Sequence, residues 1–491
     1  MIESDLKLVL MGGMMKPYKD LLDIFAFLRC CLGCKENMSR VIACMDWQEL
    51  YSFASKQAIL GLCFEGIERL GKEYPEELKR NPIGRELLMT WMGKAQQIRR
   101  QNMKVNAVAS KLFSMLREDG LRCCILKGQG NALMYPNPYS RTPGDIDAWI
   151  DASRERIMEY TQKKFELGDD IRLQHLETSL DGVPVELHFF PCSMNNPIYH
   201  ARLQKWFRRN ADLQCSHIVG LPDGAGDIAI PTTAFNVVYQ LTHLYHHFFD
   251  EGIGMRQIID YFLVVNDFSK NVFLNNDFFE SPSRFIESPR PSLAKEGSTS
   301  HPSPLSSEER DVTALRCSEP LRYKDGGASK PSPDCLSASA SKVSPSCAGW
   351  DRLDVIGDMA SDVSDSSASA AGSSAYAAFD VVRRELKYLG LWKFAGAVMY
   401  VLHEALGLPE EKMIAPMNEK RGKLLLVEIL NGGNFGQHFT KYGHFTQQGM
   451  AKKYFLKIWR NMHFVRYYPA EALSEPIFRT WHFFWRMKNK K

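Results

Sequence analysis

The chain has 491 residues, of which 45% are hydrophobic and 24% charged, and its formal net charge is +4 at pH 7. These proportions are ordinary for a soluble globular protein, and the length allows two or three domains with cores of their own. So small a net charge argues against a dedicated binder of long nucleic acid, whose domains are usually strongly basic, but it allows a local basic pocket.

The 12 cysteines do not have the pattern of a disulfide framework. Cys31 and Cys34 form a lone C-x-x-C pair without a second pair at zinc-ribbon spacing, which favours packing at a helix end over a metal or redox role. Other cysteines lie inside apolar runs, where a reduced, buried thiol is expected: Cys44, Cys63, Cys123 and Cys124.

Targeting features are not evident in the sequence. Glu3 and Asp5 make the N-terminus acidic, and no apolar core of a signal peptide is present. No run approaches the roughly 18 apolar residues that a membrane-spanning helix needs. We therefore expect a cytoplasmic protein without a transmembrane segment.

Residues 1–118 are expected to form an N-terminal helical region. Apolar residues recur at helical spacing from Asp46 to about residue 60, and Asp46 is suited to cap that helix. A second long helix is predicted over about 87–116, and Asp119-Gly120 is a common kind of helix stop.

Residues 119–220 differ in character, because short apolar strands alternate there with helices. Asp181-Gly182 is predicted to form a turn between the last two strands. The elements predict a small α+β core of about 100 residues. The strands are expected near 121–127, 145–151, 171–178 and 183–190, and the helices near 130–135 and 154–165.

Helices return in a C-terminal helical region made of residues 221–268 and 379–491. Within it, helices are predicted for 233–250 and 255–267. Residues 269–378, which separate the two parts, are rich in Ser, Pro and Ala without periodicity, which predicts a disordered insertion. The aromatic, basic helix at 476–491 is expected to pack onto the body, with membrane or RNA binding as the alternative.

A glycine-containing turn and two aspartates indicate a nucleotide site. Lys127-Gly128-Gln129-Gly130 follows the first predicted strand, and glycines in such a turn let a phosphate approach the backbone. Asp145 and Asp147 begin the next strand and, at i and i+2, point to the same face. Two carboxylates this close repel each other unless a cation lies between them, although a solvated turn is the alternative.

A third carboxylate is available from the fourth predicted strand, whose strict alternation places Glu186 and His188 on one face. If this strand lies beside the Asp145 and Asp147 strand, three carboxylates converge, as a two-metal site requires. One ion would hold the triphosphate and the other would lower the pKa of an acceptor hydroxyl. Glu186 would be the third ligand or the general base.

Lys127 and Arg141 are the cations expected to neutralise the phosphates as pyrophosphate leaves. For Lys127 the alternative is a surface lysine at the end of a strand. For Arg141 it is a salt bridge with a nearby aspartate.

Two further helical pairs are candidates for the wall of a pocket. His243 and His247 lie one turn apart, but they lack the Glu of an H-E-x-x-H motif and a third ligand, so packing is favoured over zinc binding. Arg256 and Asp260 either form an i, i+4 ion pair or line the nucleotide pocket.

An ordered set of motifs runs along the chain: Asp46-Trp47, Gln57, Leu126-Lys127-Gly128, Tyr135-Pro136, Arg141, Gly144–Asp147, Val185–His188, Gly252–Tyr261 and Tyr468-Pro469. In this order they resemble the uncharacterised nucleotidyltransferase family within the DNA polymerase β-like nucleotidyltransferase superfamily. The resemblance covers nearly the whole chain except about 270–377.

The resemblance implies a palm-like mixed sheet and transfer of an NMP from an NTP such as ATP. Asp145, Asp147 and Glu186 would be ligands of Mg²⁺ or Mn²⁺. One departure is that the superfamily usually has Gly-Ser or Gly-Gly shortly before its Asp-x-Asp element, whereas Gln129 follows Gly128 here. The hydroxyl that helps to hold the β- and γ-phosphates is therefore missing, and compensation would come from Gly130, Lys127 or Arg141.

The preferred hypothesis is a metal-dependent nucleotidyltransferase that acts on an NTP and a hydroxyl-bearing acceptor, either a small molecule or a protein. A nucleotide-binding or scaffold protein that has lost transfer is the first alternative, motivated by Gln129. A metal-dependent phosphohydrolase that uses the same carboxylates is the second. The modest charge argues against long nucleic acid as a partner, although tRNA ends stay open as acceptors.

Overall fold

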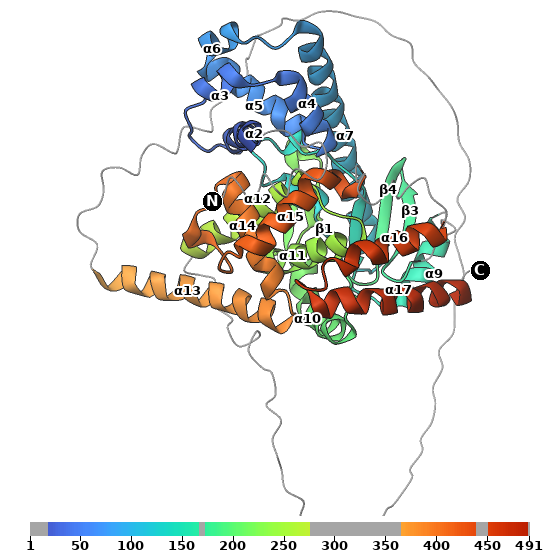
Figure 1. The fold of residues 1–491 in the computed structure, drawn as a ribbon. Coiled ribbons are helices and arrows are strands. Elements are labelled where there is room, and N and C mark those ends of the chain that lie inside the picture. Colours follow the sequence, from blue (N-terminus) through green and yellow to red (C-terminus); the bar gives the residue numbers. More distant parts are fainter. Residues whose placement is uncertain (1–17, 166–171, 275–364, 438–449, 490–491) are drawn as a thin grey trace, which may run out of the picture. The chain divides into compact units, whose positions relative to one another are not determined.

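The computed structural model describes residues 18–165, 172–274, 365–437 and 450–489. This part of the chain is mostly helical and holds a small mixed sheet of four strands (Figure 1), so the predicted α+β fold class is confirmed. Most of the insertion predicted for 269–378 lies outside the described residues. None of the described helices combines the length and the apolar character that crossing a bilayer requires.

Between residues 18 and 118, where the structure describes the N-terminal part, there are six helices: α2 (Tyr18–Cys31), α3 (Ser39–Cys44), α4 (Trp47–Lys56), α5 (Leu60–Glu73), α6 (Pro75–Arg80) and α7 (Arg85–Glu118). Asp46 caps α4 as predicted, because its carboxylate accepts a hydrogen bond from the Glu49 N–H at 2.9 Å. The buried Trp91 joins α7 to α5 by donating from Nε1 to the Leu60 carbonyl at 2.9 Å. The 34 residues of α7 continue from there to the sheet (Figure 1).

The sheet has the strand order β1-β2-β4-β3, with β1 at Cys123–Leu126, β2 at Ile146–Ile150, β3 at His175–Leu180 and β4 at Val183–His188. β2 and β4 are parallel, and the other two pairs are antiparallel. Asp181 and Gly182 have φ values of 50° and 70°, as a two-residue type I′ hairpin turn requires. This turn fixes the pairing of β3 with β4, and β3 therefore spans His175–Leu180 instead of the predicted 171–178.

The two faces of the sheet belong to different cores. Side chains such as Ile125, Ala148 and Leu187 pack with the C-terminal half of α7 in one core. The residues between them along the strands, including Leu126 and Trp149, belong to a second core with the C-terminal helices. The polar side chains of the site come from this second face.

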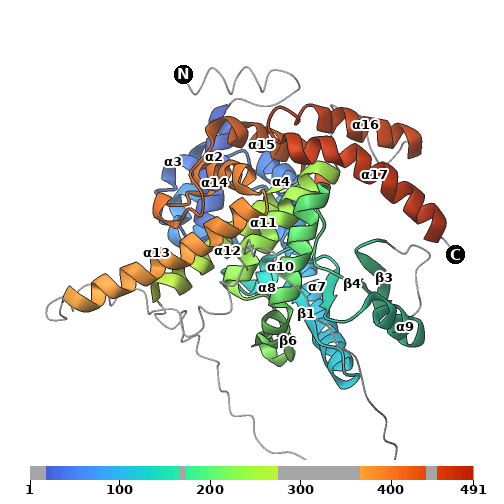
Figure 2. The same cartoon turned by 90° about the horizontal axis from the view of Figure 1, so that it is seen from below.

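The C-terminal part is helical apart from the small hairpin of β5 (Ile218–Gly220) and β6 (Asp227–Ala229), which the sequence analysis missed. In Figure 2, α11 and α12 lie side by side, as do α16 and α17. The helices are α10 (Pro197–Ser216), α11 (Thr233–Asp250), α12 (Met255–Leu274), α13 (Asp365–Tyr388), α14 (Trp392–Leu406), α15 (Glu419–Gly432), α16 (Met450–Met462) and α17 (Pro469–Asn489). Shorter elements are α8 (Gly128–Ala132), α9 (Arg154–Lys164), η1 (Pro138–Ser140), η2 (Pro222–Gly224), η5 (Glu410–Lys412) and η6 (Asn434–Gly436).

Two predicted boundaries in this part are wrong. α12 continues to Leu274 instead of ending at 267, because Val272 is buried and the buried Ser269 hydroxyl donates to the Val265 carbonyl at 2.9 Å. α17 begins at Pro469, ahead of the predicted start at 476. The expectation that the final helix packs its aromatic side chains is wrong for three of them, since Trp481, Phe483 and Phe484 are exposed.

The chain before and after residues 275–364 forms one compact unit within the described residues. The buried Gln57 connects the two parts directly. Its Nε2 donates to the Ile429 carbonyl of α15 at 3.2 Å, and its Oε1 accepts from the Met255 N–H of α12 at 2.8 Å. Helices α12 and α15 are therefore both held against the N-terminal helical part at Gln57.

Candidate functional site

The structure brings the predicted carboxylates together at the ends of two neighbouring strands. Asp147 of β2 lies directly opposite Glu186 of β4 in the parallel pairing. Asp145 precedes β2 and is exposed, whereas Asp147 is buried. The fourth predicted strand therefore lies beside the strand of Asp147, which was the condition for the three carboxylates to converge.

Repulsion among these carboxylates changes their acidity. The charge of Asp147, loss of solvent and the charge of Glu186 together raise the pKa of Asp145 to about 6. Burial would raise the pKa of Asp147 as well, but the positive charge of Lys127 and a hydrogen bond from His188 hold it below its ordinary value. Asp147 is thus the carboxylate whose negative charge is compensated within the protein.

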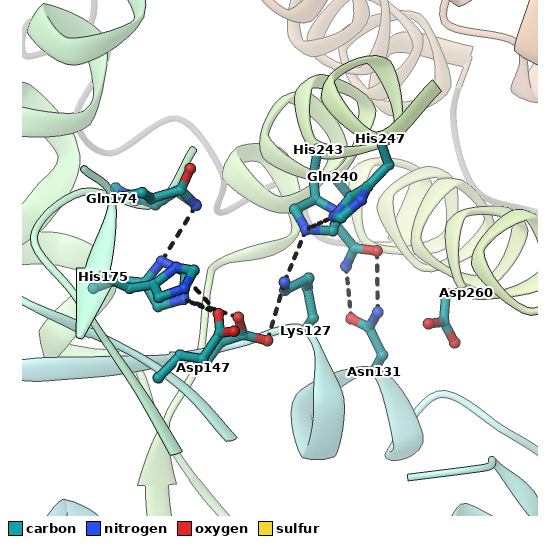
Figure 3. A network of polar contacts seen from close by, with 12 residues as sticks. Lys127, Asn131, Asp147, Gln174, His175, Gln240, His243, His247 and Asp260 are labelled. Atoms are coloured by element: carbon teal, nitrogen blue, oxygen red, sulfur yellow. Dashed lines mark hydrogen bonds and ion pairs between the residues drawn. The ribbon is translucent and has the colours of Figure 1, made fainter. Parts of the chain in front are cut away.

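Lys127 provides that compensation from the end of β1. Its Nζ lies 3.0 Å from Asp147 Oδ2 and 2.9 Å from His243 Nε2 of α11 (Figure 3). Burial, the charge of Lys127 and His247 lower the pKa of His243 well below its ordinary value, so this imidazole is neutral and accepts from the ammonium group. The backbone of Lys127 has a φ of 52°, an uncommon conformation for a side chain of this size that turns the chain sharply from β1 into α8.

Histidines cover the other side of the carboxylates. His188 is buried, and its Nε2 lies 2.9 Å from Asp147 Oδ1 and 3.1 Å from Glu186 Oε2. Burial opposes its protonation, but the hydrogen bonds to both carboxylates raise its pKa to about 9. His175 lies directly across from His188 in the antiparallel pairing. The sequence analysis placed His188 at the pocket and missed His175.

A buried ion pair forms the opposite wall of the site. Arg141 donates from Nε and Nη2 to the two oxygens of Asp260 at 2.9 and 2.8 Å, and the Tyr135 hydroxyl donates to Asp260 at 2.7 Å. Arg141 therefore forms a salt bridge with an aspartate, which was the alternative to a phosphate-binding role. Asp260 pairs with Arg141, while Arg256 donates to the Thr142 carbonyl at 3.0 Å.

These groups line a cavity with a volume of about 520 Å³, part of which opens to solvent. Most of the residues proposed from the sequence contribute to its wall: Lys127, Gly128, Arg141, Asp145, Asp147, His243, Arg256 and Asp260. The cavity is thus cationic on two sides and acidic at the strand ends.

The sequence of this region matches a known family. Residues 43–280 match the model of the uncharacterised nucleotidyltransferase family. This part of the chain is therefore similar to that family. The resemblance stated from the motifs is therefore confirmed for residues 43–280, which include the sheet, α11 and α12, and its extension to the C-terminal part stays a prediction. No curated protein and no solved structure matches the chain.

Three of the predicted site residues do not line the cavity wall: Gly130, Glu186 and His188. A Cβ on Gly130 would lie 3.0 Å from Cγ2 of Ile230, so close packing of α8 is sufficient to explain this glycine. Glu186 also lies outside the wall but remains beside it, opposite Asp147. The phosphate role of Gly130 stays a prediction that this geometry does not favour.

The sequence analysis missed an amide pair and an aromatic ring in the wall. Asn131 and Gln240 exchange two hydrogen bonds, of 3.0 and 2.6 Å (Figure 3). Phe435 of η6 lies with its ring centroid 5.4 Å from the Arg256 guanidinium and 5.2 Å from the ring of His247. Phe435 stands outside the range that matches the nucleotidyltransferase family, so the C-terminal part adds its own side chain to the cavity.

Proposed function

We propose that this protein is a metal-dependent nucleotidyltransferase that moves an NMP from an NTP to a hydroxyl-bearing acceptor and releases pyrophosphate. The observation that carries the proposal is the direct register of Asp147 with Glu186, beside Asp145 and a cavity with cationic walls. The similarity of residues 43–280 to the nucleotidyltransferase family supports the same class of reaction.

The electrostatics of the carboxylates fit a divalent cation. The charge of Asp147, loss of solvent and the charge of Glu186 raise the pKa of Asp145 to about 6, so the repulsion outweighs the opposing attraction of Lys127. Asp145 and Asp147 would hold Mg²⁺ or Mn²⁺, since hard cations bind carboxylate oxygens, and Glu186 lies beside Asp147. When bound, the ion would stabilise charge on the triphosphate and make the acceptor hydroxyl more acidic.

Lys127 and Arg256 are the residues that we assign to the phosphates. Lys127 remains charged, because the attraction of Asp147 and Asp145 raises its pKa in spite of burial. Within the described residues, the buried Nε of Arg256 has no hydrogen-bond partner. A phosphate oxygen would satisfy this N–H, and the charge would favour departure of pyrophosphate. Arg141 is already paired with Asp260 and would act chiefly by holding the wall of the cavity that lies opposite the carboxylates.

Glu186 is the group that we assign to the proton of the acceptor hydroxyl. Although burial opposes ionisation, the hydrogen bond from His188 holds its pKa below the ordinary value, so Glu186 is ionised and able to accept a proton. His188 carries its own proton at neutral pH, with a pKa of about 9, and is therefore unsuited to be the base.

One observation favours a second candidate, a nucleotide-binding protein without transfer. Both oxygens of Asp147 already have partners, Lys127 at 3.0 Å and His188 at 2.9 Å, which compete with a cation. The presence of Gln129 where the superfamily usually has Ser or Gly is weaker support for this candidate than the sequence suggested. The Gln129 side chain is buried and donates a hydrogen bond to Asn106. It is therefore directed into the interior rather than toward a phosphate.

The test is a pyrophosphate-release and label-transfer assay with each of the four α-labelled NTPs, Mg²⁺ or Mn²⁺, and a cell extract as the acceptor pool. Wild type is compared with Asp145→Ala/Asp147→Ala, and Glu159→Ala, an exposed carboxylate on α9, is the matched control. We expect label on an acceptor with wild type and Glu159→Ala only. NTP binding without any labelled product would support the second candidate, and phosphate or NMP release without an acceptor product would indicate a phosphohydrolase.

A further inference from the structure

Three potential metal-ligating side chains meet on one face of the β3–β4 hairpin. Glu186 and His188 are two residues apart on β4, and His175 lies opposite His188 on β3. The donor atoms of the three side chains all lie within 4.8 Å of one another. The hairpin register therefore places two imidazoles and a carboxylate around one point.

His175 is the side chain that the site described above leaves unexplained. It is 8% exposed, and neither of its ring nitrogens forms a hydrogen bond with a described residue. Its Nδ1 nevertheless lies 3.3 Å from Glu186 Oε2. Buried polar side chains normally have partners, so an unsatisfied imidazole directed at a carboxylate requires an explanation.

The distances fit the edges of a metal polyhedron. Around a tetrahedral metal with bonds of about 2.0–2.2 Å, neighbouring ligand atoms are roughly 3.3–3.6 Å apart. Glu186 Oε2 lies 3.3 Å from His175 Nδ1 and 3.1 Å from His188 Nε2. Small side-chain rotations would therefore be sufficient to place an ion between these three atoms.

The ring of His188 is directed at the carboxylates. Its Nε2 lies 2.9 Å from Asp147 Oδ1 and 3.1 Å from Glu186 Oε2. The nitrogen that would bind an ion therefore already faces the carboxylate that would share it.

We propose that His175, Glu186 and His188 form a binding site for one first-row transition-metal ion of the Zn²⁺ type. Two imidazoles and one carboxylate favour such ions over Mg²⁺, which prefers oxygen ligands. Three protein ligands leave a coordination position open, and Asp147 Oδ1 is the nearest further oxygen to His188 Nε2, at 2.9 Å. The site shares Glu186 with the proposed active centre and lies next to the Asp145 and Asp147 cation position, and a bound ion would replace the proton on His188 Nε2. Metal binding at this site does not depend on nucleotidyl transfer.

The test measures metal binding by the full chain without nucleotide. Chelator-treated protein is titrated with Zn²⁺ in excess Mg²⁺, followed by calorimetry and by metal analysis after dialysis, and Co²⁺ serves as a spectroscopic probe through its visible absorption. The variants are His175→Ala, His188→Ala and Asp145→Ala. His463→Ala, which removes an exposed histidine directly after α16, is the matched control.

We expect one Zn²⁺ per wild-type chain, unchanged in His463→Ala and Asp145→Ala, and at least about 100-fold weaker binding in His175→Ala and His188→Ala. His175→Asn, which keeps a polar side chain of similar reach, is the second variant if His175→Ala unfolds, and it should bind equally weakly. Equal Zn²⁺ binding by wild type and a folded His175 variant, or no binding by wild type, would overturn the site. Failure of the transfer assay would leave this binding result intact, so the two proposals fail separately.

Discussion

Lys127 Nζ lies 3.0 Å from Asp147 Oδ2, and this contact exists because Leu126 of β1 pairs directly with Asp147 of β2. The contact gives Lys127 two roles, since it compensates a buried carboxylate and places a positive charge in the cavity. A phosphate in the cavity would share the same ammonium group. Lys127 is therefore the residue at which loss of charge should affect both the carboxylates and the nucleotide.

We expect Lys127→Met to lower kcat/KM for NMP transfer by about 10²–10³-fold, because a charge that stabilises the departing phosphates is removed. The pKa of Asp147 should also rise toward its ordinary value. Steady-state kinetics measure the first effect, and the pH dependence of activity reports the second. Lys163→Met, which removes an exposed lysine of α9, is the control. An unchanged kcat/KM would exclude Lys127 from the phosphate site.

Asp145 should make the stability of the metal-free protein depend on pH. Its pKa is about 6 in the folded chain against an ordinary 3.8, so the folded state binds more protons between about pH 4 and pH 6. The free energy of unfolding therefore decreases as the pH rises through this window. Asp145→Asn removes the unfavourable free energy of ionising Asp145 in the folded chain. The Tm of this variant should exceed that of wild type at pH 8 and equal it below about pH 4.

Thermal unfolding in a chelator measures this difference, and Asp227→Asn, an exposed carboxylate of β6, is the control. Saturating Mg²⁺ should raise the Tm of wild type at pH 8 and have less effect on Asp145→Asn, because the cation replaces the missing positive partner. A higher Tm for wild type than for Asp145→Asn in the chelator at pH 8 would contradict the proposed repulsion.

Phe435 is expected to stack on the nucleotide base, because its ring lines the cavity beside Arg256. Base–aromatic stacking contributes about 1–3 kcal/mol, so Phe435→Ala should raise the KM for the NTP by about 5–150-fold with a smaller effect on kcat. Phe435→Tyr should retain most of the affinity. Phe455→Ala, an exposed aromatic of α16, is the matched control. If kcat falls with the KM unchanged, the ring acts on another step.

The pair of Arg141 and Asp260 should be required for stability. Both side chains are buried, so Asp260→Ala leaves an uncompensated guanidinium next to Arg256. We expect the free energy of unfolding to fall by about 3–5 kcal/mol. Chemical denaturation measures this loss, and Asp380→Ala, which breaks an exposed ion pair with Arg383, should have little effect. A double variant, Arg141→Met/Asp260→Leu, should recover part of the loss.

Much of the sheet could be predicted from the sequence, because its strands are short apolar runs with clear turns between them. The alternation of β4 correctly placed Glu186 and His188 on one face. The same information would have located His175, since a two-residue turn at Asp181-Gly182 fixes the register and pairs His188 with His175. His175 was missed because the turn was predicted from the sequence, but the residues that face each other across the hairpin were not assigned.

Other parts of the site depend on contacts that local pattern does not contain. Asp260 is one helical turn from Arg256 but pairs with Arg141, which is 119 residues away in the sequence. Phe435 reaches the cavity because the backbone of η6 packs on Gly254, where a Cβ would lie 2.8 Å from the Cα of Asn434. Periodicity describes one element at a time, and these contacts depend on how distant elements dock.

Gln57 bonds both to Met255, before the insertion, and to Ile429, after it, and the cavity likewise has walls from both sides. The covalent link through 275–364 is therefore not what holds the two parts together. Two separately encoded polypeptides that divide the chain within 275–364 should associate and copurify through a tag on either one, and they should regain the activity of the intact chain. A division at Met399, inside the buried helix α14, should prevent association. In evolutionary terms, this protein could tolerate fission of its gene at the insertion.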